Sequence, residues 1–147
     1  MILEEAEFQA TIPATDLDRA RRFYEQELGL APELVLDVGV IYRFGKGTAF
    51  FLYPSGTAGA GHTLGSWFVE DIEAAVRELR TIGIEFEEYD YPDLKTVDGI
   101  ADLGAELAAW FKDSEGNILA VSHLKDQAPS SCCEGRAAGG CIGESDR

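Results

Sequence analysis

The fold of this chain is decided by residues 16–30, which read DLDRARRFYEQELGL, and by a partial copy of them at residues 71–84, DIEAAVRELRTIGI. Each stretch starts with an aspartate, a residue that caps the free amides of a helix's first turn. Each then carries apolar residues at helical spacing and ends near a glycine, Gly29 or Gly83, which can take the left-handed conformation. The repeat predicts two copies of one supersecondary unit, which bury their apolar faces together.

Strand-like segments surround both predicted helices in the same order. One segment precedes each helix, at residues 7–14 and 64–69, and three follow it: about 33–38, 39–44 and 47–53 in the first copy, and near 84–90, 106–112 and 117–123 in the second. Residues 54–61 are rich in glycine and have the composition of a linker. Residues 91–103 form a long polar loop, which is typical of the lid or rim of a site. This order predicts an α+β protein of two βαβββ modules.

These motifs resemble those of the vicinal oxygen chelate superfamily, the glyoxalase/bleomycin-resistance/dioxygenase fold. The matching residues are Asp16-Leu17, Phe23-Tyr24, Leu28-Gly29, Asp71-Ile72 and Asp113-Ser114-Glu115-Gly116-Asn117. The resemblance implies two βαβββ modules, at residues 7–54 and 62–124, that form a curved, barrel-like mixed sheet around a central cup with the helices outside. It also implies a homodimer. We therefore expect residues 1–124 to form the domain and residues 125–147 to be a flexible, disordered tail.

Enzymes of this superfamily hold one divalent metal with four inward-facing side chains, and the resemblance places those positions at Gln9, Phe51, Leu64 and Ala120. Only the Gln9 amide carries a donor, whereas a hard or borderline metal needs several. A shift of two residues would bring His62 inward in place of Leu64, which still gives only two ligands. We therefore predict no metal at the usual site and no cofactor.

Strand alternation counted from those positions predicts which residues face the cup. They are Gln9, Thr11, Phe51, Tyr53, Leu64, Ser66, Phe68, Ile118, Ala120 and Ser122, with Tyr42 and Trp110 at the rim. Aromatic and aliphatic walls with a few hydroxyls are the usual lining of a small-molecule site, although the same side chains could simply fill the cup as core. The set contains no carboxylate, histidine or lysine for acid–base catalysis, so the catalytic residues stay unknown. The strand faces opposite the cup carry apolar residues such as Ile12, Phe50 and Trp67. We expect these residues to pack beneath the helices.

The net charge of −15 narrows the range of partners. A negative field repels phosphate backbones and anionic lipids, which argues against nucleic acid and membrane partners. It favours cationic ligands, although solubility alone accounts for such a charge. Residues 85–93 are densely acidic and aromatic. Such a segment is typical of a sheet edge whose charges prevent pairing with another chain, or of a contact for a cationic ligand. Neither a signal-peptide pattern nor a long apolar segment is present, so we expect a cytoplasmic protein.

All three cysteines, Cys132, Cys133 and Cys141, lie in the predicted tail. They are weak candidates for binding soft ions such as cadmium, copper(I) or arsenite, with incidental thiols as the alternative. A domain without cysteine needs no oxidising compartment.

Three functions stay open at this point. The first is a metal-free protein of the vicinal oxygen chelate type that binds a hydrophobic or cationic small molecule, for resistance or sequestration. The second is an enzyme, either a lyase/isomerase or a dioxygenase, with an atypical or absent metal site. The third is a soft-metal stress protein that acts through the tail thiols. Because the usual metal ligands are mostly missing, we favour binding over catalysis.

Overall fold

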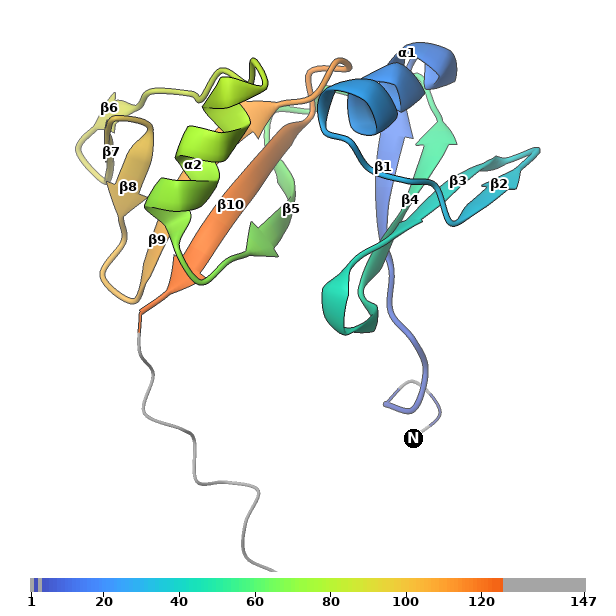
Figure 1. The fold of residues 1–147 in the computed structure, drawn as a ribbon, viewed down its shortest axis with the longest axis horizontal. Coiled ribbons are helices and arrows are strands. Elements are labelled where there is room, and N and C mark those ends of the chain that lie inside the picture. The colour runs from blue at the N-terminus through green and yellow to red at the C-terminus, as the bar shows by residue number, and fades with distance from the viewer. Residues whose placement is uncertain (1, 3, 126–147) are drawn as a thin grey trace, which may run out of the picture.

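The structure, a computed structural model, describes residue 2 and residues 4–125. Within this part the chain forms a four-stranded and a six-stranded sheet, which lie side by side and carry one α-helix each (Figure 1). The predicted α+β class with two βαβββ-like modules is thereby confirmed. The predicted tail, apart from Lys125, and the cysteines Cys132, Cys133 and Cys141 lie outside the described residues.

The first module contains four strands, one α-helix and two short helical turns. These are β1 (Ala10–Ala14), α1 (Leu17–Arg22), the π-helical turn η1 (Phe23–Glu27), β2 (Leu34–Leu36), β3 (Gly39–Arg43), the 3-10 turn η2 (Gly45–Gly47) and β4 (Ala49–Pro54). The strands lie in the order β1-β4-β3-β2. The first and last strands of the module, β1 and β4, are parallel neighbours, and the other pairs are antiparallel.

The second module repeats this arrangement with more strands. They and the helix are β5 (Thr63–Phe68), α2 (Ile72–Thr81), β6 (Asp90–Tyr91), β7 (Leu94–Val97), β8 (Ile100–Asp102), β9 (Glu106–Lys112) and β10 (Ile118–Leu124). The order is β5-β10-β9-β8-β7-β6. Again the first strand, β5, lies parallel to the last strand, β10.

The segment after α2 differs from the prediction. Residues 84–90 do not form the expected strand, because before β6 only Phe86 forms a bridge, to Phe111. The expected loop at residues 91–103 instead contains the hairpin of β7 and β8. Its turn is Asp98-Gly99, with φ angles of 53° and 80°. Asp-Gly favours such hairpin turns, so this dipeptide was the signal that could have revealed the hairpin.

Both predicted helix starts are confirmed. The Asp16 side chain accepts a hydrogen bond from the Arg19 amide at 3.0 Å, and the Asp71 side chain accepts one from the Ala74 amide at 3.0 Å. These bonds satisfy amides that the helix itself leaves free. After α1 the chain continues without interruption as the π-helical turn η1, for which the sequence gives no signal.

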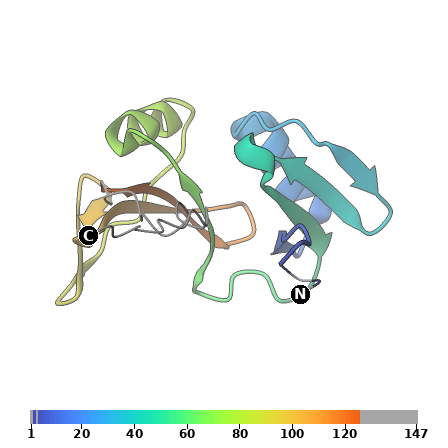
Figure 2. The same cartoon turned by 90° about the horizontal axis from the view of Figure 1, so that it is seen from below.

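Both helices lie on the same side of the two sheets (Figure 2). The sheet residues that face them belong to one continuous core, in which Ile12 and Phe50 of the first module and Leu119 of the second are buried. Trp67 packs against this core and stacks on the Phe111 ring at 6.1 Å. The expectation of packing beneath the helices is therefore confirmed for Ile12 and Phe50, whereas Trp67 packs against the edge of the core and stays partly exposed.

A turn between β9 and β10, residues 113–117, ties the second module to the first. Asn117 Nδ2 donates to the Pro13 carbonyl oxygen at 2.8 Å, and Asn117 Oδ1 accepts from the Gly59 amide at 3.0 Å. Glu115 accepts hydrogen bonds from the Asp16 amide at 2.6 Å and from Arg19 Nε at 2.7 Å. The turn thereby holds the start of α1, the end of β1 and the linker in one place.

Among the described residues, no helix combines the length and the apolar character that crossing a membrane requires.

Candidate functional site

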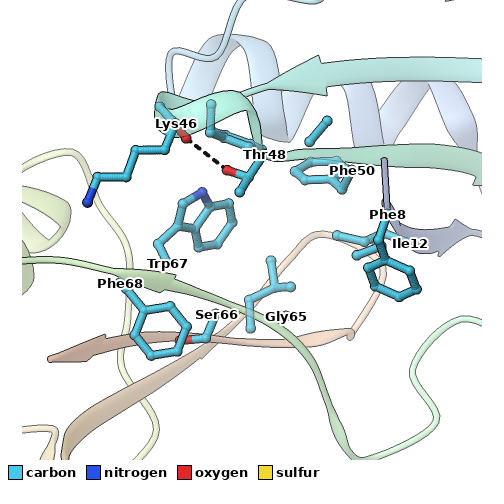
Figure 3. A pocket seen from close by; sticks show the side chains of 14 residues that line it. Phe8, Ile12, Lys46, Thr48, Phe50, Gly65, Ser66, Trp67 and Phe68 are labelled. Atoms are coloured by element: carbon cyan, nitrogen blue, oxygen red, sulfur yellow. Dashed lines mark hydrogen bonds between the residues drawn. The ribbon is translucent and has the colours of Figure 1, made fainter. Parts of the chain in front are cut away.

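A pocket of about 700 Å³ opens between the two sheets, on the side that faces the helices (Figure 3). We call it the aromatic pocket. Its lining residues are Phe8, Ala10, Ile12, Phe44, Gly45, Lys46, Thr48, Ala49, Phe50, Gly65, Ser66, Trp67, Phe68 and Leu119. Within the described part of the chain, none of the lining residues comes from α1 or α2. The pocket therefore lies where the two short helices leave the apolar sheet faces uncovered.

The wall of the pocket is built around the Trp67 ring. This ring meets Phe44 edge to face at 5.7 Å and lies 6.5 Å from Phe50. The Phe50 ring continues the cluster into the core, where it contacts Tyr24 at 5.2 Å and Tyr42 at 5.1 Å. Because close-packed core rings fix the orientation of the wall, the pocket presents a preformed apolar surface.

The turn η2 closes one end of the pocket. Phe44 donates its amide to the Thr48 carbonyl at 2.7 Å, and Thr48 Oγ1 donates to the Gly45 carbonyl at 3.0 Å. Lys46 lies at the tip of the turn with a left-handed φ of 60°. Figure 3 shows its side chain leading away from the turn on the same side of the pocket as Trp67. Of the described lining residues, Lys46 is the only charged one.

Two exposed aromatic side chains border the mouth of the pocket. Phe8, just before β1, is 90% exposed, and Phe68, at the end of β5, is 64% exposed. Figure 3 shows them on different sides of the opening. The apolar surface thus continues from the wall to the rim.

Solved structures with the same two-sheet arrangement identify the fold. The chain is similar to a glyoxalase/bleomycin resistance protein/dioxygenase from Alicyclobacillus acidocaldarius, with 18% identity over 82% of this chain and 92% of that chain and a TM-score of 0.60. It is similar to a lactoylglutathione lyase from Agrobacterium tumefaciens, with 20% identity over 80% and 92% of the two chains and a TM-score of 0.56. The chain has the vicinal oxygen chelate fold. Neither a family model nor a curated protein matches its sequence.

On this vicinal oxygen chelate fold, most of the residues predicted to line the cup lie outside the aromatic pocket. Ser66 and Phe68 line the pocket. The other eight do not: Gln9, Thr11, Phe51, Tyr53, Leu64, Ile118, Ala120 and Ser122. Strand alternation turns most of these side chains to the sheet faces away from the helices, as Thr11 and Phe51 alternate with the core residues Ile12 and Phe50. Leu64 is an exception, because it packs against the helix-facing core. A ligand site on the predicted cup face therefore stays a prediction. The aromatic pocket is lined mainly by residues of the helix-facing side, together with Ser66 and Phe68 from the other face of β5.

The predicted residues form two groups, one on each sheet. On the first sheet the Phe51 ring stacks on the Tyr53 ring at 6.1 Å. On the second, Ser66 Oγ donates to Ser122 Oγ at 2.8 Å. A bulge in β5 separates Leu64 from this group: Ile118 pairs with Thr63 and Leu119 with Gly65, which leaves Leu64 as the extra residue.

The two residues predicted at the rim lie in different surroundings. Tyr42 is fully buried, and its hydroxyl donates to Glu25 Oε1 at 2.9 Å. Burial, together with this hydrogen bond, raises the pKa of Tyr42, so the phenol stays protonated at neutral pH. Trp110 is half-buried and meets the Tyr89 ring edge to face at 5.6 Å. Neither residue lines the aromatic pocket.

The residues at the four family metal positions do not fit a metal. Gln9 offers an amide, the Phe51 ring lies against Tyr53, and Ala120 is only 3% exposed between its strand neighbours Ser66 and Trp110. In the described part of the chain, no group of three or more His, Cys, Asp or Glu side chains could hold a metal ion. One amide is too small a donor set for a stable site.

Sequence reasoning missed most of the pocket lining. The prediction does not include Phe8, Phe44, Lys46, Thr48 and Gly65, because strand alternation counted from the family's metal positions leads to the other sheet face. One signal was present in the sequence: a lysine between two glycines, Gly45-Lys46-Gly47, directly after an aromatic residue.

Proposed function

We propose that this chain binds a small molecule with an apolar body in the aromatic pocket. The observation that supports this proposal is the pocket itself, which has a volume of about 700 Å³ and a wall of packed aromatic rings. Small-molecule sites commonly have about 300–1,000 Å³ and a mostly apolar lining with a few polar groups. The few polar side chains of this lining are those of Lys46, Thr48 and Ser66.

We further propose that the protein sequesters its ligand, as in resistance, and does not transform it. Two of the polar lining groups are already engaged, because the Thr48 hydroxyl donates to Gly45 and the Ser66 hydroxyl to Ser122. Among the described lining residues there is no histidine or carboxylate that could pair with Lys46 as acid and base. The alternatives of an enzyme and of a stress protein acting through the tail thiols remain predictions without support from the pocket.

We also propose that the protein is a homodimer. The edge strand β2 exposes Leu34, Val35 and Leu36, and Val38 follows them on the surface. An apolar edge strand tends to pair with another chain unless it is covered. A second copy of the chain would cover it.

The ligand proposal can be tested by filling the pocket. Gly65 lines it, and a Cβ added there meets no atom within 4 Å, so Gly65→Phe places a ring in open space. Gly56, in the linker, is equally uncrowded and does not line the pocket, so Gly56→Phe is the matched control. The probe is the neutral dye N-phenyl-1-naphthylamine, which fluoresces in apolar sites.

We expect the unaltered protein and Gly56→Phe to bind the dye with one-to-one stoichiometry, and Gly65→Phe to lose at least tenfold in affinity. The background Trp110→Phe leaves Trp67 as the sole tryptophan, so quenching of its emission reports occupation of the pocket. Equal binding by both glycine variants, at unchanged melting temperatures, would refute the proposal.

A further inference from the structure

We propose that the aromatic pocket prefers a ligand with one negative charge, such as an aromatic carboxylate or sulfonate, whose charge is met by Lys46. This inference rests on the proposed function and adds to it the charge of the ligand. It differs from the expectation drawn from composition, which favoured a cationic ligand.

The residues that line the pocket carry a net positive charge, whereas the whole chain carries a net negative charge. The sequence has 27 acidic and 12 basic residues, yet the described lining holds one lysine and no carboxylate. Salt screens charges beyond about 8 Å at physiological ionic strength. At the turn η2 the nearby Glu7 carboxylate is paired with Arg43, whose Nη1 also donates to the Gly47 carbonyl oxygen. Lys46 therefore adds a positive charge that no carboxylate of the described lining offsets.

The Lys46 ammonium is available for a ligand. Six other basic side chains of the described residues form ion pairs with carboxylates: Arg19, Arg21, Arg43, Lys95, Lys112 and Lys125. Within the part of the chain that the structure describes, no ion pair or hydrogen bond involves the Lys46 side chain. A charged group without a partner beside an apolar wall favours a ligand that supplies the opposite charge.

The backbone conformation of Lys46 is a second observation that supports a function for this residue. Its left-handed φ of 60° is a conformation that glycine or asparagine adopts at lower cost than lysine. Residues held in such sparsely populated conformations cluster at functional sites, which supports a function for the Lys46 side chain.

The wall supplies the surface for the rest of the ligand. The rings of Phe44, Phe50 and Trp67 form a continuous apolar surface next to Lys46. Aromatic rings also attract cations, but an ammonium ligand would meet the Lys46 charge and find no carboxylate in the lining. An apolar body with one anionic group satisfies both the rings and the lysine.

Two dyes that differ by one sulfonate test this inference: 1-anilinonaphthalene-8-sulfonate and the neutral N-phenyl-1-naphthylamine. Lys46→Met removes the charge and keeps an unbranched side chain. We expect it to weaken binding of the sulfonate about fivefold, which corresponds to about 1 kcal/mol for an exposed charge pair, and to leave binding of the neutral dye unchanged. The matched control Lys95→Met removes a lysine on β7 that does not line the pocket and should change neither affinity.

Added salt should weaken binding of the sulfonate by the unaltered protein and have little effect on Lys46→Met. Glycine suits the left-handed conformation at this position, so Lys46→Gly removes the charge without disturbing the turn. It should therefore bind both dyes as Lys46→Met does. Circular dichroism checks that each variant is folded, because loosely packed states also bind the sulfonate dye.

The outcomes separate the two proposals. If both Lys46 variants bind the sulfonate as tightly as the unaltered protein while Gly65→Phe loses the neutral dye, the charge inference is wrong and the proposed function stands. The charge inference is also wrong if the cation tetraphenylphosphonium displaces the neutral dye at lower concentration than the sulfonate does. If Gly65→Phe retains both dyes, the proposed function itself fails.

Discussion

The Tyr24 hydroxyl donates a hydrogen bond to Asp113 Oδ2 at 2.6 Å, across 89 residues of sequence and between the two modules. Both side chains are buried. Burial, and then the negative charge of Asp113, raise the pKa of Tyr24, which keeps the phenol protonated as a donor. Asp113 also accepts from Asn117 Nδ2 at 2.9 Å and from the amides of Glu115 and Asn117. A buried carboxylate is tolerated here because four donors surround it.

We expect Tyr24→Phe to lower the free energy of unfolding by about 1–2 kcal/mol, because it removes one donor from a buried charge. Urea denaturation followed by circular dichroism measures the change. Tyr53→Phe is the control, since the structure gives the half-buried Tyr53 hydroxyl no hydrogen bond among the described residues. A loss in Tyr53→Phe as large as that in Tyr24→Phe would contradict the assignment.

The stabilisation by Glu115 should depend on pH. Burial of its side chain opposes ionisation, but the hydrogen bonds from Arg19 and the Asp16 amide outweigh this effect, and the pKa of Glu115 is lowered. A carboxyl group with a lowered pKa in the folded state stabilises the protein above its unfolded pKa of about 4.3, and this stabilisation is lost as the pH falls. We therefore expect Glu115→Gln to be less stable than the unaltered protein at pH 7, with a difference that shrinks below about pH 4.

Urea titrations at several pH values between 3 and 8 measure that difference. The Asp16 carboxylate, which lies near Glu115, acts in the opposite direction and is unchanged in both proteins. A stability difference that is constant over the whole range would show that the Glu115 charge does not contribute.

Gly39 should not accept a side chain. It lies in β3 with a φ of 150°, and an added Cβ would come within 2.2 Å of the Leu52 carbonyl oxygen on β4. Because that atom belongs to the backbone of a paired strand, it cannot move away alone. We expect Gly39→Ala to cost about 3 kcal/mol or more, or to prevent folding.

Gly47→Ala is the matched control for Gly39→Ala, since Gly47 also has a positive φ, of 77°, but an added Cβ meets no atom within 4 Å. Its expected cost is about 1 kcal/mol. Melting temperatures rank the two variants. Equal effects would mean that the close approach of β3 and β4 at Gly39 is absent in solution.

The exposed edge of β2 should govern self-association. We expect light scattering to give twice the chain mass of 16.0 kDa at micromolar concentration, and Val35→Lys to shift this mass toward that of one chain. Val97→Lys, at an exposed apolar residue on β7, is the control. A dimer that persists in Val35→Lys would place the contact elsewhere, and a monomeric unaltered protein would refute the dimer.

Much of the fold could be predicted from the sequence because its signals are local. Asp16 and Asp71 each accept a hydrogen bond from the amide three residues later. Their capping role can therefore be recognised from a few neighbouring residues. The β7–β8 hairpin was missed although its Asp98-Gly99 turn is also local, because the long polar segment around it favours a loop. The π-helical turn at Phe23–Glu27 has no local signal at all.

The site was predicted less well than the fold. Alternation correctly separated the core-facing residues Ile12 and Phe50 from the other sheet face. It could not show that the helices are too short to cover the whole core-facing side, which is what leaves the aromatic pocket open. Nor could it show that Phe44 and Trp67, 23 residues apart, meet across the two modules at 5.7 Å. Such contacts depend on how the sheets are placed relative to each other.

The five residues from Asp113 to Asn117 have a consequence for how the molecule melts. They satisfy polar groups at the start of α1, at the end of β1 and in the linker, so neither half of the duplicated architecture is complete in isolation. Heat should therefore produce a single calorimetric peak whose van't Hoff and calorimetric enthalpies agree. A polypeptide cut in the linker should regain its shape only when both fragments are mixed.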